Sequence, residues 1–401
     1  MTEMLDKKEV LKNMIKRLHA GEDPVKIKEE FKDFIKDTDS TSIAKIEEEL
    51  IKEGMPREEI HKLCDVHIAL FKESIEKEKV HTPSGHPIHI LIEEHRILLR
   101  FADNFKNVVQ KLPEKKFSLT RQELDDIKQA AEHFQNSSSH YLREENVLFP
   151  YLEKHGITQP PAMMWMEHDK IRGIEKNIFQ WIESHQKKDS KLGIGELKEL
   201  VILLAETLSN HFYKETNILF PAGLKVINDN EWIDIRREFD ELGYCPFTPE
   251  TVMRTREEPQ KSTVKPEKGS MFSFETGNLS FKEIESILNT LPVDLTFVDK
   301  EDTVRYFSQT KERIFPRTKA VIGRKVQQCH PQKSIHVVDQ ILDDFKKGRR
   351  DVAEFWIKLN ERVIYIRYFP VRDSNDNYLG CLEVTQDITD IKSIEGEKRL
   401  L

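Results

Sequence analysis

The stretch "HYLREENVLFP", residues 140–150, returns as "HFYKETNILFP", residues 211–221. Both copies keep a histidine, an aromatic residue, a glutamate, an asparagine and Leu-Phe-Pro in register, and each glutamate follows its histidine by four positions. The repeat is either a duplicated structural unit or a duplicated set of ligands. The rest of the chain distinguishes these two interpretations.

A second repeated element accompanies the first. "EEHRI" places His95 ahead of the first copy and "MEHDKI" places His168 ahead of the second, at nearly the same interval. Each half therefore pairs one histidine on a first helix with a His-x-x-x-Glu on a second helix.

Helix geometry predicts what these residues do together. Positions four apart lie one turn along the same face of a helix, so His140 projects with Glu144 and His211 with Glu215. If these faces point inward, four helices bring four imidazoles and two carboxylates to one place, which is a donor set for a pair of transition-metal ions. Two bridging carboxylates would leave coordination positions open for binding or chemistry. The donors suit iron or manganese, and zinc can occupy such ligands.

Four long amphipathic segments, approximately residues 88–111, 121–149, 161–187 and 194–219, are joined by short turns. This pattern predicts an all-α up-down four-helix bundle over residues 85–245. We expect Leu-Phe-Pro to close each second helix, because proline stops helices. Asn146 and Asn217 are expected to be caps or helix-end contacts.

Three further histidines lie near the predicted site. His89 is expected to face away from His95, and His133 lies on the stripe of His140, about 10 Å along the axis, where a supporting or access-route role is favoured over ligation. His86 precedes the helix, from where it could fold over the site.

The flanking sequence predicts a multidomain protein. Residues 1–80 carry helical periodicity and form a small all-α domain. Residues 246–272 are rich in proline and charge and are expected to be a linker. Residues 273–395 change to alternating β patterns and predict a separate α+β domain.

Composition excludes some classes of function. The net charge is −8, the pI is about 6.1, and charges of both signs are interspersed, so nucleic-acid binding is not expected. We expect no membrane segment, because no apolar run approaches the roughly 20 residues needed to cross a bilayer. Four widely spaced cysteines without CxxC indicate reduced thiols, and we expect a cytoplasmic protein.

"EEH", "HYLREENVLFP", "EHDKI" and "HFYKETNILFP" resemble the hemerythrin-like, HHE cation-binding bundle over residues 85–225. The resemblance implies a non-haem di-iron site, with Fe2+ or Fe3+ ions. It implies these six ligands: His95, His140, Glu144, His168, His211 and Glu215. Similar di-iron proteins are implicated in repair of nitrosatively damaged iron–sulphur clusters. Unlike the oxygen-carrying hemerythrins, this chain has Arg172, not histidine, four positions after His168, which argues against simple oxygen carriage.

Residues 280–393 resemble a PAS domain, through "FVDKEDTVRYFS", "VIGRKV" and "EVTQDITDIK". The resemblance implies a five-stranded sheet used for ligand sensing or for dimerisation, and leaves the ligand open. His330 raises haem as one ligand, although a loop histidine is the favoured interpretation. "YCPF", residues 244–247, contains a Cys-Pro pair of the kind found in haem-responsive segments. The N-terminal region resembles a helical domain of unknown function found ahead of such bundles.

These observations predict a di-iron sensor, in which O2, NO or an oxidant such as peroxide reacts at the bundle and the PAS module passes the signal to another protein or to a second copy in a homodimer. The alternative is an enzyme for NO or peroxide detoxification, or for iron–sulphur cluster repair. No catalytic residue beyond the ligands is assigned.

Overall fold

The computed structural model describes residues 82–113, 119–187, 193–253, 271–311 and 313–397, with scattered residues before position 82. The chain forms two compact units, residues 1–258 and 259–401. From the helical domain expected over residues 1–80, the structure describes α2 (Pro24–Glu30) and a few other residues, and the rest of that prediction lies outside the described residues. Among the described helices, none is long and apolar enough to span a membrane.

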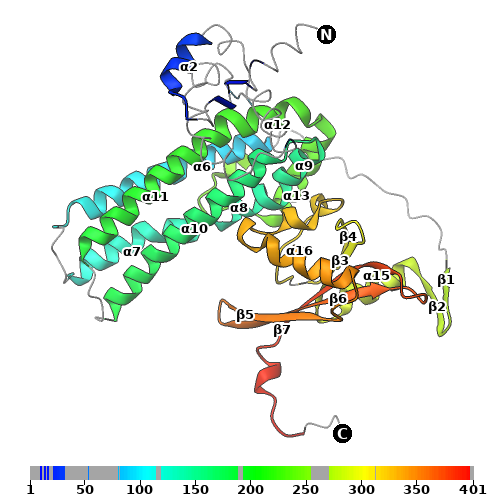
Figure 1. The fold of residues 1–401 in the computed structure, drawn as a ribbon. Coiled ribbons are helices and arrows are strands. Elements are labelled where there is room, and N and C mark those ends of the chain that lie inside the picture. The colour runs from blue at the N-terminus through cyan, green and yellow to red at the C-terminus, as the bar shows by residue number, and fades with distance from the viewer. Residues whose placement is uncertain are drawn as a thin grey trace. The chain divides into compact units, whose positions relative to one another are not determined.

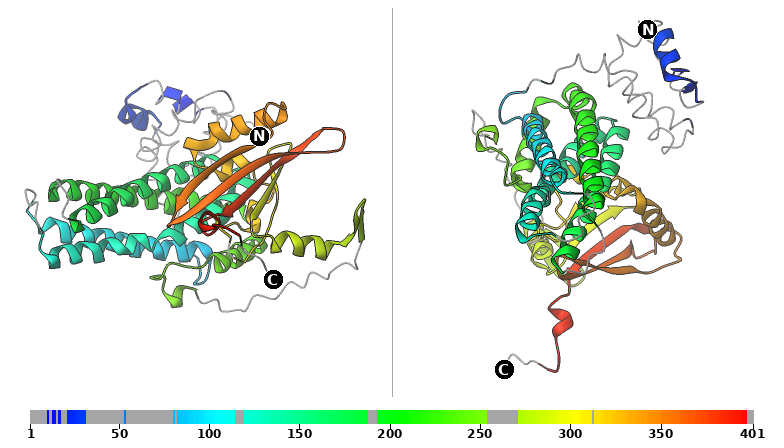
Figure 2. Two further views of the ribbon diagram at one scale, coloured as in Figure 1. Left: turned by 90° about the horizontal axis from the view of Figure 1, so that it is seen from below. Right: turned by 90° about the vertical axis from the view of Figure 1, so that its left-hand side faces the viewer.

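The long helical stretches of the first unit run side by side (Figures 1 and 2). This confirms the predicted four-helix bundle. In chain order its segments are α6 (Pro87–Gln110), α7 (Arg121–Gln135), α8 (Ser138–Arg143), the π turn η1 (Glu144–Leu148), α9 (Phe149–Lys154), α10 (Gln159–Gln186), α11 (Ile194–Lys214), the π turn η2 (Glu215–Leu219), α12 (Phe220–Val226), α13 (Asp229–Leu242) and α14 (Glu250–Met253).

Local signals in the sequence begin these helices. Thr120 and Glu123 form a reciprocal capping box at α7, and Asn228 and Glu231 form another at α13. Pro87 occupies the first turn of α6, where its missing N–H removes no helical hydrogen bond.

An apolar core fills the part of the bundle away from the repeated histidines. Phe105, Phe134, Trp181 and Leu204 are among its buried members. Trp181 Nε1 donates to the Gly193 carbonyl at 3.2 Å, which satisfies the one polar atom of this large side chain. The core keeps the four helices in register and so fixes the level at which the histidines meet.

The segment predicted as one helix over residues 121–149 is interrupted. The chain turns at Asn136 and Ser137, where the Ser137 hydroxyl donates to the Phe134 carbonyl at 2.7 Å. Polar residues that bond their own backbone favour such breaks.

The expectation that proline stops each second helix is wrong. Pro150 and Pro221 lie in the first turns of α9 and α12, which continue the helices beyond the π turns. Because a π turn already shifts the backbone hydrogen bonds by one residue, a proline that follows it breaks no established i−4 bond. Asn146 and Asn217 lie inside these π turns, not at helix ends, and donate to the Leu142 and Tyr213 carbonyls at 3.0 and 2.8 Å.

The segment expected to be linker from residue 246 begins later. Thr248 is buried, and α14 is held to the bundle because the Gly85 N–H donates to the Val252 carbonyl at 2.9 Å and Arg236 donates to the Met253 carbonyl at 2.6 Å. Residues 246–253 therefore belong to the bundle, and residues 254–270 lie outside the described part of the chain.

The second unit has a five-stranded antiparallel sheet in the order β4-β3-β7-β6-β5, which confirms the predicted α+β fold. Its elements are the hairpin β1 (Met271–Phe274) and β2 (Gly277–Ser280), α15 (Phe281–Thr290), β3 (Asp294–Asp299), β4 (Val304–Phe307), the 3-10 turns η3 (Lys319–Val321) and η4 (Val326–Cys329), α16 (Gln332–Lys346), β5 (Ala353–Leu359), β6 (Arg362–Arg372), β7 (Tyr378–Asp387) and the 3-10 turn η5 (Ile391–Ser393). Phe345 of α16 is buried with Val298, Val304 and Cys381 of the sheet.

Strands β3 and β7 approach so closely at Gly380 that no side chain fits there. Gly380 has φ +156°, and a Cβ would lie 2.1 Å from the Val298 carbonyl oxygen and 2.8 Å from the Phe297 ring. At Gly323, by contrast, φ is +87° and a Cβ would meet no atom within 4 Å.

We expect Gly380→Ala to destabilise the second unit by about 3 kcal/mol, because backbone cannot yield as a side chain can. Gly323→Ala, the matched control, should cost only about 1–2 kcal/mol for its left-handed backbone. Hydrogen exchange of the amides of β3 and β7, measured in the full-length chain, gives the loss of stability in each variant. Equal loss of protection in the two variants would contradict this account of Gly380.

His86 caps α6. Its Nδ1 accepts from the Ile88 N–H at 3.2 Å, and its ring lies 4.6 Å from that of Trp232. Burial, together with the charge of His89, lowers the pKa of His86 from 6.5 to about 4. His86 is thus a helix cap and contributes no atom to the histidine–glutamate groups described below.

Because the folded pKa of His86 lies below its unfolded value, its contribution to stability is complete above pH 6.5 and is lost as the pH falls towards 4. His86→Asn keeps a capping acceptor that does not titrate. Urea unfolding at pH 7.5, 6 and 5 should therefore show the variant losing less stability than the natural protein as the pH falls. Parallel pH profiles would rule out this role.

Candidate metal centre

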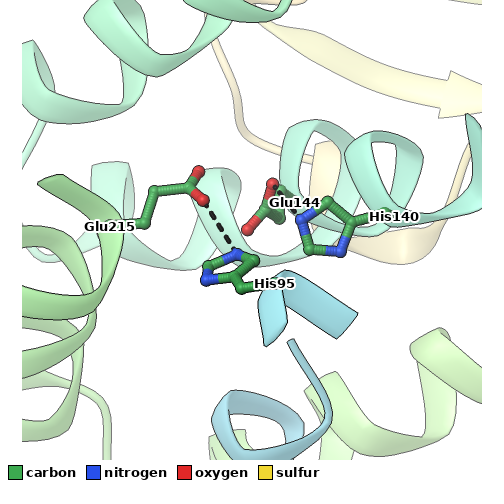
Figure 3. A group of neighbouring side chains, drawn as sticks. All are labelled: His95, His140, Glu144 and Glu215. Carbon is green, nitrogen blue, oxygen red and sulfur yellow. Dashed lines mark ion pairs between the residues drawn. The ribbon is translucent and has the colours of Figure 1, made fainter. Parts of the chain in front are cut away.

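The antiparallel helices bring all six predicted residues to one level of the bundle. His95 comes from α6, His140 from α8, His168 from α10 and His211 from α11, and Glu144 and Glu215 are the first residues of the π turns. His95 is 3% exposed and the other five are fully buried. Figure 3 shows His95, His140, Glu144 and Glu215 pointing toward one another.

The six side chains form two overlapping groups. Each group has donor atoms that all lie within 4.8 Å of one another, and both groups contain Glu144 and Glu215. The first adds His95 and His140, and the second adds His168 and His211. Two positions of two histidines each therefore share two carboxylates.

The inward-facing atoms of this cluster have no hydrogen bonds. The Nε2 atoms of the four histidines and both carboxylate oxygens of Glu144 and Glu215 are buried and unsatisfied. Nε2–oxygen distances across the cluster include 3.1 Å from His95 to Glu215 and 3.4 Å from His168 to Glu144. Buried polar atoms without partners are costly, so this many together indicate a site that binds a cation.

Three histidines are fixed from behind by carboxylates that our sequence analysis did not identify. The Nδ1 atoms of His140, His168 and His211 lie 2.7, 2.8 and 2.8 Å from Glu94, Glu145 and Glu167, respectively. Since a carboxylate accepts, each Nδ1 carries the proton, so each Nε2 would present its lone pair to a bound metal ion. The repeat contained the signal, because Glu94 and Glu167 directly precede His95 and His168.

Each of these outer carboxylates has its own cation. Arg143 donates to both oxygens of Glu94 at 2.7 and 2.6 Å, Lys214 donates to Glu167 at 2.6 Å, and Arg172 pairs with Glu145. The outer charges therefore cancel in pairs, and the two shared carboxylates at the centre are left to be balanced.

The pKa values express this charge distribution. Burial raises the pKa of Glu94, but the charge of Arg143 and the bond to His140 outweigh it and lower the value to about 2. Burial likewise opposes ionisation of Glu215, yet His211, His168 and His95 hold its pKa well below the ordinary value. The Glu215 carboxylate is thus anionic and demands positive charge.

Aromatic rings enclose the cluster. Phe212 stacks on His95 with ring centroids 4.0 Å apart, and Tyr141 lies 4.6 Å from His168. Phe149 and Phe220 stack on His168 and His95 at 5.8 and 5.5 Å. The walls exclude bulk water, which strengthens electrostatic interactions inside.

The donor set fits divalent transition metals. Imidazole nitrogens with bridging carboxylates and no thiolate are ligands for iron, manganese or zinc. Both glutamates start π turns, which occur frequently at functional sites. Two ions here would satisfy every orphaned atom of the cluster and would leave coordination positions for a small molecule.

The remaining candidate histidines lie outside both donor groups. His133 stacks on Phe101 at 3.9 Å and lines a cavity of about 330 Å³ that contains none of the six residues. His330 donates from Nδ1 to the Val326 carbonyl at 2.9 Å, as a loop histidine would. Cys245 of "YCPF" is buried, and its thiol donates to the Ser137 carbonyl at 3.7 Å.

Comparison with protein families identifies three regions. Residues 86–223 match the hemerythrin HHE cation binding domain, residues 284–389 match a PAS domain, and residues 11–77 match a family of unknown function, DUF438. The chain therefore contains a hemerythrin HHE domain between a DUF438 region and a PAS domain. This combination, with the buried histidine–glutamate cluster, supports a metal-binding sensor as the class of protein.

Solved structures also resemble the chain. The C-terminal domain of a protein from Streptococcus mutans is 31% identical, with 31% of this chain and 98% of that chain covered and a TM-score of 0.30. The PAS domain of a protein from Colwellia psychrerythraea is 17% identical, with 27% and 97% covered and a TM-score of 0.23. A sensory box sensor histidine kinase from Vibrio cholerae is 10% identical, with 26% and 89% covered and a TM-score of 0.22. No curated protein matches the chain.

We expect the double variant Glu144→Ala, Glu215→Ala to lose both ions, because both positions share these carboxylates. Elemental analysis after anaerobic reconstitution with Fe2+ should give two ions per natural chain. Glu175→Gln is the matched control, since Glu175 has a buried carboxyl oxygen but belongs to neither donor group. The ligand assignment would fail if the double variant retained the metal content of the natural protein.

Proposed function

We propose that the protein is a di-iron sensor of O2, NO or an oxidant, in which the state of the centre is communicated to the PAS domain. The observation that carries the proposal is the closed set of orphaned donors, four imidazole nitrogens and two shared carboxylates, inside an HHE domain. His95 and His140 would hold one ion and His168 and His211 the other, with Glu144 and Glu215 between them. Bound iron would supply redox chemistry and affinity for small gaseous ligands.

A chain of contacts supports communication from this centre to the segment before the PAS domain. Glu94, which holds His140 from behind, also accepts from the Thr248 hydroxyl at 2.5 Å. The guanidinium of Arg143, bonded to the same carboxylate, lies over the Phe239 and Tyr244 rings at 5.3 and 4.7 Å. A change at His140 would therefore reach Thr248 through Glu94, and Tyr244 through Glu94 and Arg143.

Residues 249–253 are fastened mainly through backbone atoms. The Ser84 hydroxyl donates to the Thr251 carbonyl at 2.9 Å, and Gly85 and Arg236 bond to Val252 and Met253. These few bonds hold to the bundle the last residues described before the segment that leads to the PAS domain. Loss of the Thr248 contact would weaken one end of this attachment.

The proposal includes a protein partner or a second copy of the chain that receives the signal through the PAS domain. The described cysteines Cys245, Cys329 and Cys381 are free thiols, so we also propose the reducing environment of the cytoplasm.

An enzyme that turns over NO or peroxide, or that serves iron–sulphur cluster repair, is the second candidate. It is favoured by two buried acids, Tyr141, whose ring lies 4.6 Å from that of His168, and Glu175, whose charge acts on Tyr141. The Tyr141 hydroxyl and one carboxyl oxygen of Glu175 have no hydrogen bond, and burial raises the pKa of Glu175 to about 8. A carboxyl of that pKa is protonated at neutral pH and could donate a proton to a bound substrate.

We expect anaerobically reconstituted protein to change its absorption spectrum with O2 or NO and, with the same gas, its rate of tryptic cleavage within residues 254–270. That segment contains Arg254, Arg256, Lys261, Lys265 and Lys268. Thr248→Val removes the hydroxyl and keeps the shape, so it should retain the spectral change and lose the change in cleavage.

Identical cleavage and oligomeric state in metal-free, iron-loaded and gas-treated natural protein would contradict sensing. Many turnovers of NO or peroxide under the same conditions would favour the enzyme instead, whereas a single stoichiometric oxidation would count against it.

A further inference from the structure

The two halves of the centre correspond residue by residue, except in the residues that support His168 and His95. The corresponding pairs are His95 and His168, His140 and His211, Glu144 and Glu215, Glu94 and Glu167, and Arg143 and Lys214. One position after the shared glutamate, however, the first copy has Glu145 and the second has Thr216. This difference falls on the atoms that support His168 and His95.

The His168 imidazole has a full charged support. Its Nδ1 lies 2.8 Å from the Glu145 carboxylate, and Arg172 pairs with that carboxylate. Arg172, which marked the departure from the oxygen carriers, is thus part of this support and no ligand.

The His95 imidazole has a weak neutral support. Its Nδ1 lies 3.4 Å from the Thr216 hydroxyl, and its ring stacks on Phe212. Leu99 stands four residues after His95, where Arg172 stands after His168. The Nδ1 of His95 therefore has neither the carboxylate nor the cation that supports His168.

The difference affects how strongly each imidazole donates to a metal. A carboxylate on Nδ1 makes the opposite nitrogen more basic and fixes the ring, and losing such a partner typically costs tenfold to a hundredfold in metal affinity. The position of His168 and His211 has two imidazoles supported in this way. The position of His95 and His140 has one, through Glu94.

We propose that the two metal positions are inequivalent by construction, so that the position of His168 and His211 binds a divalent ion first and tightly, and the position of His95 and His140 holds an exchangeable ion. This inference rests on the proposed metal centre and deepens it. Glu145 with Arg172, and Thr216, are the positioning residues that set the difference.

The exchangeable position is also the one connected to Thr248, since His140 bonds to Glu94 and Glu94 to Thr248. Residues 244–253 therefore respond to whether the second ion is present, as well as to what it binds. The chain would in this way report the supply of a divalent metal ion together with the gas or oxidant.

Release of Fe2+ to a colorimetric chelator under argon tests the proposal. Natural protein loaded with two ions should release one at least tenfold faster than the other. Glu145→Thr with Arg172→Leu should bring the slow phase to within about threefold of the fast one. Thr216→Glu with Leu99→Arg transplants the charged support and should slow the fast phase about tenfold. Glu238→Gln, at a buried glutamate of α13 outside both donor groups, is the control and should leave both phases unchanged.

Release of both ions at the same rate from the natural protein would overturn the proposal that the two positions are inequivalent. An equal effect of Glu145→Thr with Arg172→Leu on the fast and slow phases would also overturn it. Absence of bound metal in the natural protein would instead overturn the proposed centre itself. Circular dichroism of the metal-free variants checks their folding. Glu145→Gln keeps a hydrogen-bond acceptor without its charge, and if a double variant fails to fold, an unchanged slow phase in Glu145→Gln would also overturn the proposal.

Discussion

The structure of the bundle depends on two buried carboxylates, Glu144 and Glu215. Both face the four central histidines, and their oxygens have no hydrogen bond. Two anions in a fully buried site are unfavourable unless positive charge joins them. The surrounding cations do not serve, because Arg143, Arg172 and Lys214 are each committed to an outer carboxylate. The shared carboxylates thus lie inside a shell whose charges are paired, and a divalent ion would supply the positive charge that they require.

The helices are deformed at the residues that meet this requirement. Each shared glutamate begins a π turn, and a proline follows in the next helix. The side-chain amides of Asn146 and Asn217 bond to carbonyls one turn back and stabilise the deformation. The remainder of the bundle is ordinary apolar packing, so the irregular backbone is confined to the functional end.

The same shell links the centre to the end of the domain. Glu94 is shared by His140, Arg143 and Thr248, so one carboxylate supports a metal-facing imidazole and holds a segment more than a hundred residues away in sequence. A contact between residues so far apart has no local pattern. For this reason residues 246–253 had the composition of a linker although they pack on the bundle.

The sequence by itself determined the four-helix bundle, the α+β second unit and the meeting of His95, His140, Glu144, His168, His211 and Glu215, because periodicity and a repeat at i, i+4 record which residues share a helix face. Only the tertiary structure decided which carboxylate lies behind each imidazole, that Glu145 and Thr216 make the two halves unequal, and that prolines 150 and 221 continue their helices. These features depend on contacts between helices and on a backbone insertion, and neither leaves a periodic signal along the chain.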